Sequence, residues 1–331
     1  MNLAKLEKIL QKEPKFRYRQ IQKAIYGDLV ENWSQITTLP KNLREKLEKE
    51  ISLKVSGKIF KGKNKEVVKA LLDWEDGAQI ETVLMRYSDG RNTVCVSSQV
   101  GCALGCRFCA TGKLGFKRDL SVQEILSQVL FFARFLNKEN ARVTNVVFMG
   151  MGEPFLNYNQ VWEAIKKLNS PDFFNIGARR ISVSTVGITE GIRKMAGENE
   201  EVNLAISLHA PNNKLRGELI PVNKKYPLEK ILEAVDYYID QTNRKVMFEY
   251  LLIKDFNDSP QGAKELVRLM KKKLYMVNLI PYNPTGVYES TEADKIKRFR
   301  KILEQEGVNV TQRFSLGQDI TAACGQLVAR K

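Results

Sequence analysis

The chain has 331 residues, 43% of them hydrophobic, which is enough for one large domain and a smaller one. No apolar run approaches the ~18 residues of a membrane-spanning helix, and no signal-peptide core follows Met1, so we expect a cytoplasmic protein. The 53 lysines and arginines outnumber the 38 acidic residues and give a net charge of +15, which favours RNA or DNA as a partner over a general adaptation of surface charge.

The first 52 residues predict a small helical domain. Leucine and isoleucine recur at helical spacing in three short segments, which Gly27 and Pro40 separate. Residues 15–23 interleave basic and aromatic side chains, a pattern typical of surfaces that bind a single nucleic-acid strand. We therefore predict an RNA-binding accessory domain, although a helical bundle with a solvated charged face would show nearly the same pattern.

Residues 53–96 predict β-strands. Two apolar runs, 67–74 and 80–85, are separated by a turn that contains Asp-Gly. A second Asp-Gly turn precedes a short strand at 93–96. We predict a β-hairpin extension that leads into the first strand of the main domain.

Strands and helices alternate through the rest of the chain, residues 97–331. The predicted strands are 143–149, 181–186, 202–208, 245–253, 276–280 and 308–314. The predicted helices are 121–136, 159–168, 189–196, 228–241, 260–272 and 291–306, the first of them with a capping box, Ser121 to Glu124. This alternation predicts an α/β fold with a parallel sheet. A closed eight-fold barrel needs more units, so we expect a partial, TIM-like (β/α)6 barrel with its functional groups at the carboxyl ends of the strands.

Three of the five cysteines lie together, as Cys102-Ala-Leu-Gly-Cys106-Arg-Phe-Cys109. Three thiolates leave one iron of a [4Fe–4S] cluster free. This spacing is typical of radical S-adenosylmethionine (SAM) enzymes, in which the amino and carboxylate groups of SAM take that iron. Structural zinc sites have a closed shell of four ligands, and bacterial ferredoxins use a different spacing. A zinc site completed by a fourth cysteine is the alternative.

Polar residues and glycines also follow the predicted strands. The Gly-x-Gly-Glu-Pro turn at 150–154 comes directly after a strand, where backbone can approach a ligand and Glu153 can accept an ammonium group. Ser184, Ser207, the single histidine, His209, and Asn283 lie at or after the ends of other strands. Each of them could equally be an ordinary packing or turn residue.

The two remaining cysteines are Cys95, at the end of a strand-like run, and Cys324, among small residues near the C-terminus. A buried structural role is usual for a free cysteine. Two reactive thiols beside a radical source would instead indicate covalent catalysis.

These motifs resemble the RlmN/Cfr family of radical-SAM adenine methyltransferases of 23S ribosomal RNA. The resemblance runs from about residue 14 to 327 and rests on residues 81–82, 95–109, 150–154, 207–211 and 322–327. It implies a [4Fe–4S] cluster on Cys102, Cys106 and Cys109. It assigns SAM to Gly152, Glu153, Ser184, Ser207, Leu208, His209 and Asn283. Pro154 favours the RlmN type, which methylates carbon-2 of an adenosine in the peptidyl-transferase centre and in some members adenosine 37 of tRNAs. The Cfr type, which methylates carbon-8, is the alternative.

The family scheme implies roles for the other residues. Cys324 takes a methyl group from one SAM, and a second SAM gives a radical that abstracts hydrogen from methyl-Cys324, so that the carbon adds to the base. By motif match Glu81 removes the ring proton, and Cys95 then forms a transient disulfide with Cys324 and frees the product. An electron donor of flavodoxin or ferredoxin type and a monomeric enzyme are further expectations. The chain departs from the family pattern at Thr321, where an aspartate is usual, and by one extra residue between Glu81 and Cys95.

Basic side chains should make RNA affinity fall with salt. We nominate seven as RNA contacts: Lys15, Arg17, Arg19, Lys23, Lys117, Arg118 and Arg179. Two other functions stay open at this point. One is a non-catalytic RNA-binding protein with zinc on Cys102, Cys106, Cys109 and Cys324, and the other is a radical-SAM enzyme that acts on a protein or a small molecule.

Overall fold

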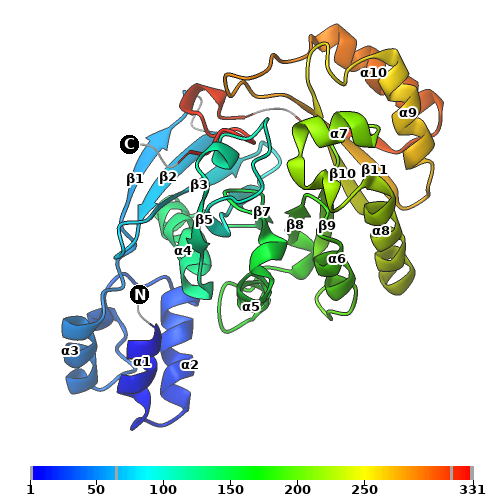
Figure 1. Cartoon of the computed structure of the whole chain (residues 1–331). Coiled ribbons are helices and arrows are strands. Elements are labelled where there is room, and N and C mark those ends of the chain that lie inside the picture. Colours follow the sequence, from blue (N-terminus) through cyan, green and yellow to red (C-terminus); the bar gives the residue numbers. More distant parts are fainter. Residues whose placement is uncertain (1–2, 64–65, 314–315, 329–331) are drawn as a thin grey trace.

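One sheet of ten strands organises the molecule, and its strand order follows the chain (Figure 1). The computed structural model describes residues 3–63, 66–313 and 316–328. The strands of the sheet are β1 (Gly57–Lys61), β2 (Val67–Asp73), β3 (Gln79–Arg86), β4 (Asn92–Cys95), β7 (Asn145–Phe148), β8 (Ile181–Thr185), β9 (Asn203–Ser207), β10 (Val246–Leu252), β11 (Tyr275–Pro281) and β12 (Val310–Gln312). Two further strands, β5 (Gln99–Gly101) and β6 (Phe116–Asp119), form a separate antiparallel pair.

From β4 onward the large sheet is parallel. β4 pairs with β7, and each later strand through β12 pairs in parallel with the one before it. In the described residues β1 and β12 pair on one side only, so the sheet is open. The predicted α/β class and the open parallel sheet are therefore confirmed. Residue 314, the last of the predicted strand 308–314, lies outside the described residues.

The first four strands are antiparallel to one another. β1 pairs with β2, β2 with β3 and β3 with β4, and the last pair places Val83 opposite Cys95. The predicted hairpin extension is thus present, and it is hydrogen-bonded directly into the parallel sheet. The division into domains at residues 52 and 96 stays a prediction, because these strands and the parallel ones share one sheet.

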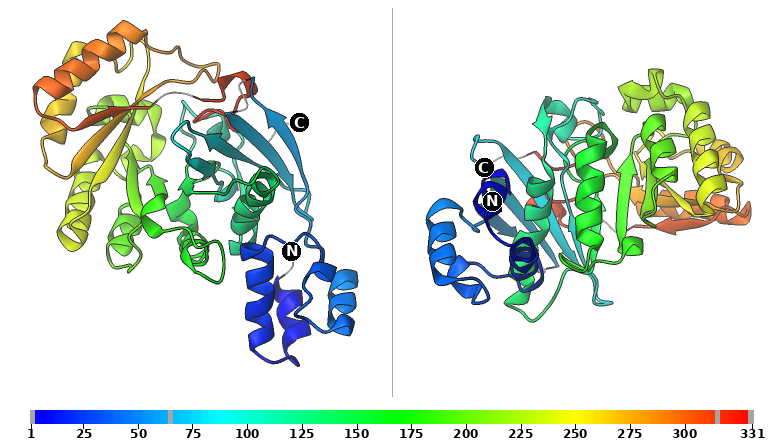
Figure 2. Two further views of the ribbon diagram at one scale, coloured as in Figure 1. Left: turned by 180° about the vertical axis from the view of Figure 1, so that it is seen from behind. Right: turned by 90° about the horizontal axis from the view of Figure 1, so that it is seen from below.

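The helices of the core lie on the outer side of the curved sheet (Figure 2). They are α4 (Val122–Asn137), α5 (Tyr158–Asn169), α6 (Thr189–Ala196), α7 (Asn213–Leu219), α8 (Leu228–Thr242), α9 (Pro260–Met270) and α10 (Ala293–Gln305). The predicted capping box begins α4: the backbone N–H of Glu124 donates to Ser121 Oγ (3.3 Å), and that of Ser121 donates to Glu124 Oε2 (2.8 Å). In the described part of the chain, no helix is long and apolar enough to span a membrane.

Three helices, α1 (Leu3–Leu10), α2 (Phe16–Gln22) and α3 (Lys41–Glu50), form a group beside α4 (Figure 1). Trp33 is fully buried in this group and donates through Nε1 to the carbonyl of Ile51 (2.6 Å). The hydroxyl of Tyr26 donates to Gln123 of α4 (3.0 Å). The predicted N-terminal helices are present, and the buried Tyr26–Gln123 hydrogen bond joins them to α4 of the core.

Candidate active site

All five cysteines line one cavity at the carboxyl ends of the parallel strands. About 1190 Å³ of empty space lies within the cavity and its opening to solvent. Its wall also includes residues at the ends of successive strands: Met149, Gly150, Gly152, Glu153, Ser184, Ser207, His209, Glu249, Leu251 and Arg313. The predicted location of functional groups, at this edge of the sheet, is where the structure gathers them.

The loop of Cys102, Cys106 and Cys109 follows β5 and is fastened at its start. The N–H of Cys102 donates to the carbonyl of Gly115 (2.9 Å). Gly101 has φ +78°, and a Cβ there would lie 1.9 Å from the Gly115 carbonyl oxygen, so only glycine fits. Burial raises the pKa of Cys102 to about 11. A thiolate at this position near neutral pH therefore needs a nearby positive charge, which a metal supplies.

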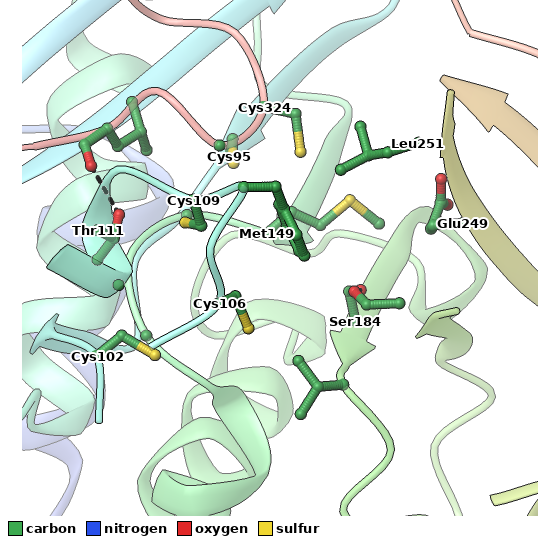
Figure 3. A pocket seen from close by; sticks show the side chains of 18 of the residues that line it. Cys95, Cys102, Cys106, Cys109, Thr111, Met149, Ser184, Glu249, Leu251 and Cys324 are labelled. Atoms are coloured by element: carbon green, nitrogen blue, oxygen red, sulfur yellow. Dashed lines mark hydrogen bonds between the residues drawn. The ribbon is translucent and has the colours of Figure 1, made fainter. Parts of the chain in front are cut away.

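The donor set fits an iron–sulfur cluster better than a single metal ion. In residues 3–63, 66–313 and 316–328, no group of three or more Cys, His, Asp or Glu side chains is gathered as ligands of one ion. A cuboidal cluster takes one thiolate per iron, so its ligands stand apart. Figure 3 shows the thiols of Cys102, Cys106 and Cys109 spread along their loop and Cys324 on a different segment, next to Cys95. The structure does not gather the four sulfurs of the zinc alternative.

The glycine-rich turn after β7 has a structural role that the sequence did not reveal. Gly152 has φ +97°, and a Cβ there would lie 2.5 Å from Cβ of Gln99. The close approach that requires glycine is thus to the protein itself. Glu153 lines the cavity; its Oε2 accepts from the N–H of Val186 (2.9 Å) and its Oε1 from that of Phe155 (3.1 Å). Burial raises the pKa of Glu153 to about 7, and a carboxylate has lone pairs left for a ligand cation.

Ser184 and Ser207 lie on the neighbouring strands β8 and β9 and both line the cavity, with their hydroxyl oxygens 3.4 Å apart. His209 has φ +57° and accepts through Nδ1 from the N–H of Leu251 (3.1 Å), so its proton is on Nε2. Its ring lies edge-on to that of Phe108, with centroids 4.8 Å apart. Burial lowers the pKa of His209 to about 3, so the imidazole is neutral at physiological pH.

We expect this neutral histidine to weaken the fold in acid. The folded pKa lies below the unfolded value of about 6.5, so the unfolded state binds the proton more readily and the unfolding free energy falls as pH drops below about 6.5. From pH 7 to pH 5 the loss is up to about 2 kcal/mol. His209→Asn keeps an acceptor for Leu251 and suits the positive φ. Urea unfolding at both pH values should show a smaller loss in the variant, and equal losses would contradict the assignment.

Cys95 and Cys324 lie side by side in the cavity, and both are free thiols (Figure 3). Cys95 is the last residue of β4, and burial raises its pKa to about 12, with the neighbouring Cys324 adding to the rise. Desolvation also raises the pKa of Cys324, which the guanidinium of Arg313 partly offsets. The sequence placed these cysteines far apart, and the structure brings them together.

The segment that carries Cys324 is tied to the cysteine loop. The N–H of Ala110 donates to the carbonyl of Gly325 (2.7 Å). The hydroxyl of Thr111 donates to the carbonyl of Leu327 (2.7 Å; Figure 3). Asn283 donates through Nδ2 to the carbonyl of Cys324 (3.1 Å). These bonds hold Cys324 over the loop, and Asn283 contacts the segment itself.

Three of the predicted site residues are not among the described residues that line the cavity. Leu208 is fully buried, and its N–H donates to the backbone carbonyl of Glu249 (3.1 Å). Glu81 is fully buried, with Oε1 2.8 Å from Lys69 Nζ. Together with Asn283, these residues are absent from the lining of the cavity as the structure describes it. Their roles stay predictions.

The comparisons with known proteins agree on one family. Residues 96–267 match the Radical SAM superfamily. The chain is 47% identical to the probable dual-specificity RNA methyltransferase RlmN of Dictyoglomus thermophilum, over 96% of this chain and 91% of the relative. The relative of the same name from Chloroflexus aurantiacus is 44% identical, over 99% and 92%. The chain belongs to the RlmN family of radical-SAM RNA methyltransferases.

A solved structure supports the same membership. The crystal structure of a radical SAM methyltransferase from Sphaerobacter thermophilus superposes with a TM-score of 0.94 at 43% identity, over 100% of this chain and 98% of that one. Membership of the RlmN family implies a [4Fe–4S] cluster and SAM. It sets aside both other functions that the sequence had left open, the zinc protein and the enzyme acting on a protein or small molecule.

Sequence reasoning missed several charged residues of this RlmN-family site. Glu249 lines the cavity, accepts from Asn278 (2.9 Å), and has its pKa raised by burial. Arg313 also lines it and donates to the sulfur of Met149 (3.6 Å). Arg216, which is not among the described lining residues, is fully buried nearby and donates to the carbonyls of Leu208 and Tyr226. The sequence did contain a signal for Glu249: it is the single charged residue in the otherwise apolar strand β10, which indicates a buried charge with a specific role.

The nominated RNA contacts differ in their surroundings. Arg19 is paired with Asp172 (2.8 Å), Arg118 with Asp76 (2.6 Å) and Arg179 with Glu201 (2.7 Å). Arg17 donates to the carbonyl of Thr38 (2.7 Å). Three lysines are exposed and form no ion pair with another described residue: Lys15, Lys23 and Lys117.

Proposed function

We propose that this chain methylates carbon-2 of an adenosine in the peptidyl-transferase centre of 23S rRNA and adenosine 37 of tRNAs, with Cys324 as the methyl carrier. The observation that carries the proposal is the pair of thiols, Cys95 and Cys324, inside the cavity that the three-cysteine loop lines. The name of its relatives, dual-specificity RNA methyltransferase, supports two RNA substrates.

In this proposal the cluster and SAM bind in the cavity. Cys102, Cys106 and Cys109 would hold the cluster, which with SAM supplies a radical source. Glu153 has its carboxylate in the cavity, where it can bind the SAM ammonium, and the hydroxyls of Ser184 and Ser207 can bind other polar groups of SAM. The remaining SAM contacts in this proposal are Gly152 and His209, which line the cavity, and Leu208 and Asn283, which are not among its described lining residues.

Two steps fall to the thiols. Cys324, as a thiolate, forms a bond to the methyl carbon of a first SAM while the sulfonium–methyl bond breaks and S-adenosylhomocysteine leaves. The charge of Arg313 favours that thiolate. After the carbon of methyl-Cys324 has bonded to the base with a second SAM consumed, and Glu81 has taken the ring proton, Cys95 attacks the sulfur of Cys324. A disulfide forms as the sulfur–carbon bond to the RNA breaks; the electron pair of that bond stays on the carbon, which takes a proton and becomes the methyl group. A thiol reductant would then return the disulfide to two thiols.

Further partners belong to the same proposal. The exposed lysines Lys15, Lys23 and Lys117 suit phosphate contacts, with the N-terminal helices as an accessory RNA-binding domain. Reduction of the cluster calls for a one-electron donor of flavodoxin or ferredoxin type. The enzyme acts as a monomer in the cytoplasm, where both RNA substrates occur.

Nucleoside analysis tests the proposal. Full-length protein, reconstituted with iron and sulfide and given SAM and a reductant, should convert adenosine to 2-methyladenosine in 23S rRNA and in tRNA. Mass spectrometry and NMR of the digested RNA identify the methylated carbon. 8-Methyladenosine would establish the carbon-8 alternative, and absence of any methylated adenosine from active, cluster-loaded protein would reject the function.

A further inference from the structure

A buried ion pair, Lys69–Glu81, forms hydrogen bonds to the Cys324 segment, residues 318–328, on both sides of the cysteine. We propose that Lys69 is a positioning residue, which with Glu81 anchors this segment, and that Glu81 becomes available to substrate only when the anchor opens. The proposal rests on the proposed role of Cys324 as methyl carrier, but its contacts and its test concern the segment alone.

The contact upstream of Cys324 comes from Lys69 on β2. Its Nζ donates to Thr321 Oγ1 (3.2 Å) and lies 3.4 Å from the Thr321 carbonyl oxygen. Thr321 has φ +50°, a left-handed conformation in which a residue other than glycine needs support from its surroundings. The lysine therefore holds a bend three residues before the thiol.

The contact downstream comes from Glu81 on β3. Its Oε2 accepts from the N–H of Val328 (2.8 Å), four residues after Cys324, while Oε1 lies 2.8 Å from Lys69 Nζ. Among the residues that the structure describes, and apart from the ion pair itself, each hydrogen bond of these two side chains goes to the segment. The pair thus does more than neutralise two charges in the core.

Burial and location make the anchor stiff. The side chains of Lys69 and Glu81 are 6% and 0% exposed, and their strands are paired neighbours in the large sheet. Removing one charge of such a pair leaves the other buried without compensation, which disrupts the contacts around it. The same geometry engages the Glu81 carboxylate with Val328, and Glu81 is not among the described residues that line the cavity. Release of the segment is therefore what would free Glu81 to accept a proton.

Lys58 on β1 provides a matched control. Lys58 and Lys69 both lie over the ring of Phe60, with Nζ 5.7 Å and 5.3 Å from its centroid, but only Lys69 contacts the segment. Replacement of either lysine by methionine keeps the length of the side chain and removes its charge. Thr321→Val is a milder second variant: it removes the hydroxyl acceptor at an exposed position and leaves the ion pair intact.

Hydrogen–deuterium exchange of full-length protein tests the anchor. In Lys69→Met, peptides that cover residues 318–328 should exchange at least about tenfold faster, while peptides from β4 and β7 stay unchanged. Thr321→Val should accelerate the same peptides by about two- to threefold, and Lys58→Met should match the wild type. Faster exchange throughout the sheet would mean a purely structural role, and unchanged exchange in both Lys69→Met and Thr321→Val would overturn the proposal.

Kinetics separate this proposal from the proposed function. In Lys69→Met the rate constant for methylation of Cys324 by SAM should fall about tenfold or more while the Kd for SAM is unchanged, because the carrier is misplaced and the SAM site is intact. A raised Kd with an unchanged rate would contradict a positioning role. If RNA were methylated without Cys324, the proposed function would fail, whereas the exchange result would still decide the anchor.

Discussion

Replacing Cys324 by alanine should abolish methylation of RNA while SAM is still cleaved reductively. The variant loses the proposed nucleophile for the methyl group, and removal of a catalytic nucleophile lowers turnover by about 10⁴-fold or more. The loop of Cys102, Cys106 and Cys109 is on a separate segment, so its chemistry should persist. The measurements are methyladenosine in RNA by mass spectrometry and 5′-deoxyadenosine by chromatography, on protein with about four irons per chain.

The comparison with a loop variant makes this test specific. Cys106→Ala should lose both iron and SAM cleavage, because it removes a thiol of the cluster loop, whereas Cys324→Ala should lose neither. RNA methylation at the wild-type rate by Cys324→Ala would show that the methyl group does not pass through this residue.

Replacing Cys95 by alanine should leave RNA covalently attached to the protein. In the proposed sequence the base becomes bonded through one carbon to the sulfur of Cys324, and Cys95 is the adjacent thiol that releases it. Without that thiol the adduct has no route to product, and turnover should stop after about one event per chain. A denaturing gel would show a slower protein–RNA band, and mass spectrometry of the digest would locate the nucleotide on Cys324.

The double variant Cys95→Ala/Cys324→Ala is the control for this adduct, and it should show no slower band. Free methyladenosine formed at the wild-type rate by Cys95→Ala would mean that another group releases the product. The alanine variant should fold, since Cys95 forms no disulfide and occupies a strand end.

The sequence predicted the parallel sheet because its strands are buried apolar runs between amphipathic helices, a local signal. It did not predict β5 and β6, which are three and four residues long, or α7, whose seven residues include a fully buried arginine, Arg216. Such short elements are defined by the packing around them. Their own pattern is too brief to indicate a structure.

For the candidate site, too, the sequence predicted the local features and not the long-range contacts. The spacing of Cys102, Cys106 and Cys109 is local, so the sequence alone indicated the cluster loop. The proximity of Cys95 to Cys324 depends on contacts across the whole chain, and only the resemblance implied it. Gly152 illustrates the limit of a motif: the pattern shows that glycine is needed, but the neighbour that excludes a side chain is Gln99.

The Val328–Glu81 hydrogen bond joins residues 247 positions apart, and the Thr321–Lys69 bond joins residues 252 apart. During synthesis the strands β2 and β3 leave the ribosome long before the peptide that docks on them. A nascent chain can therefore complete most of its sheet before Cys324 is made. The Cys324 segment can dock only on strands that were made earlier, so its contacts with Lys69 and Glu81 form late in folding.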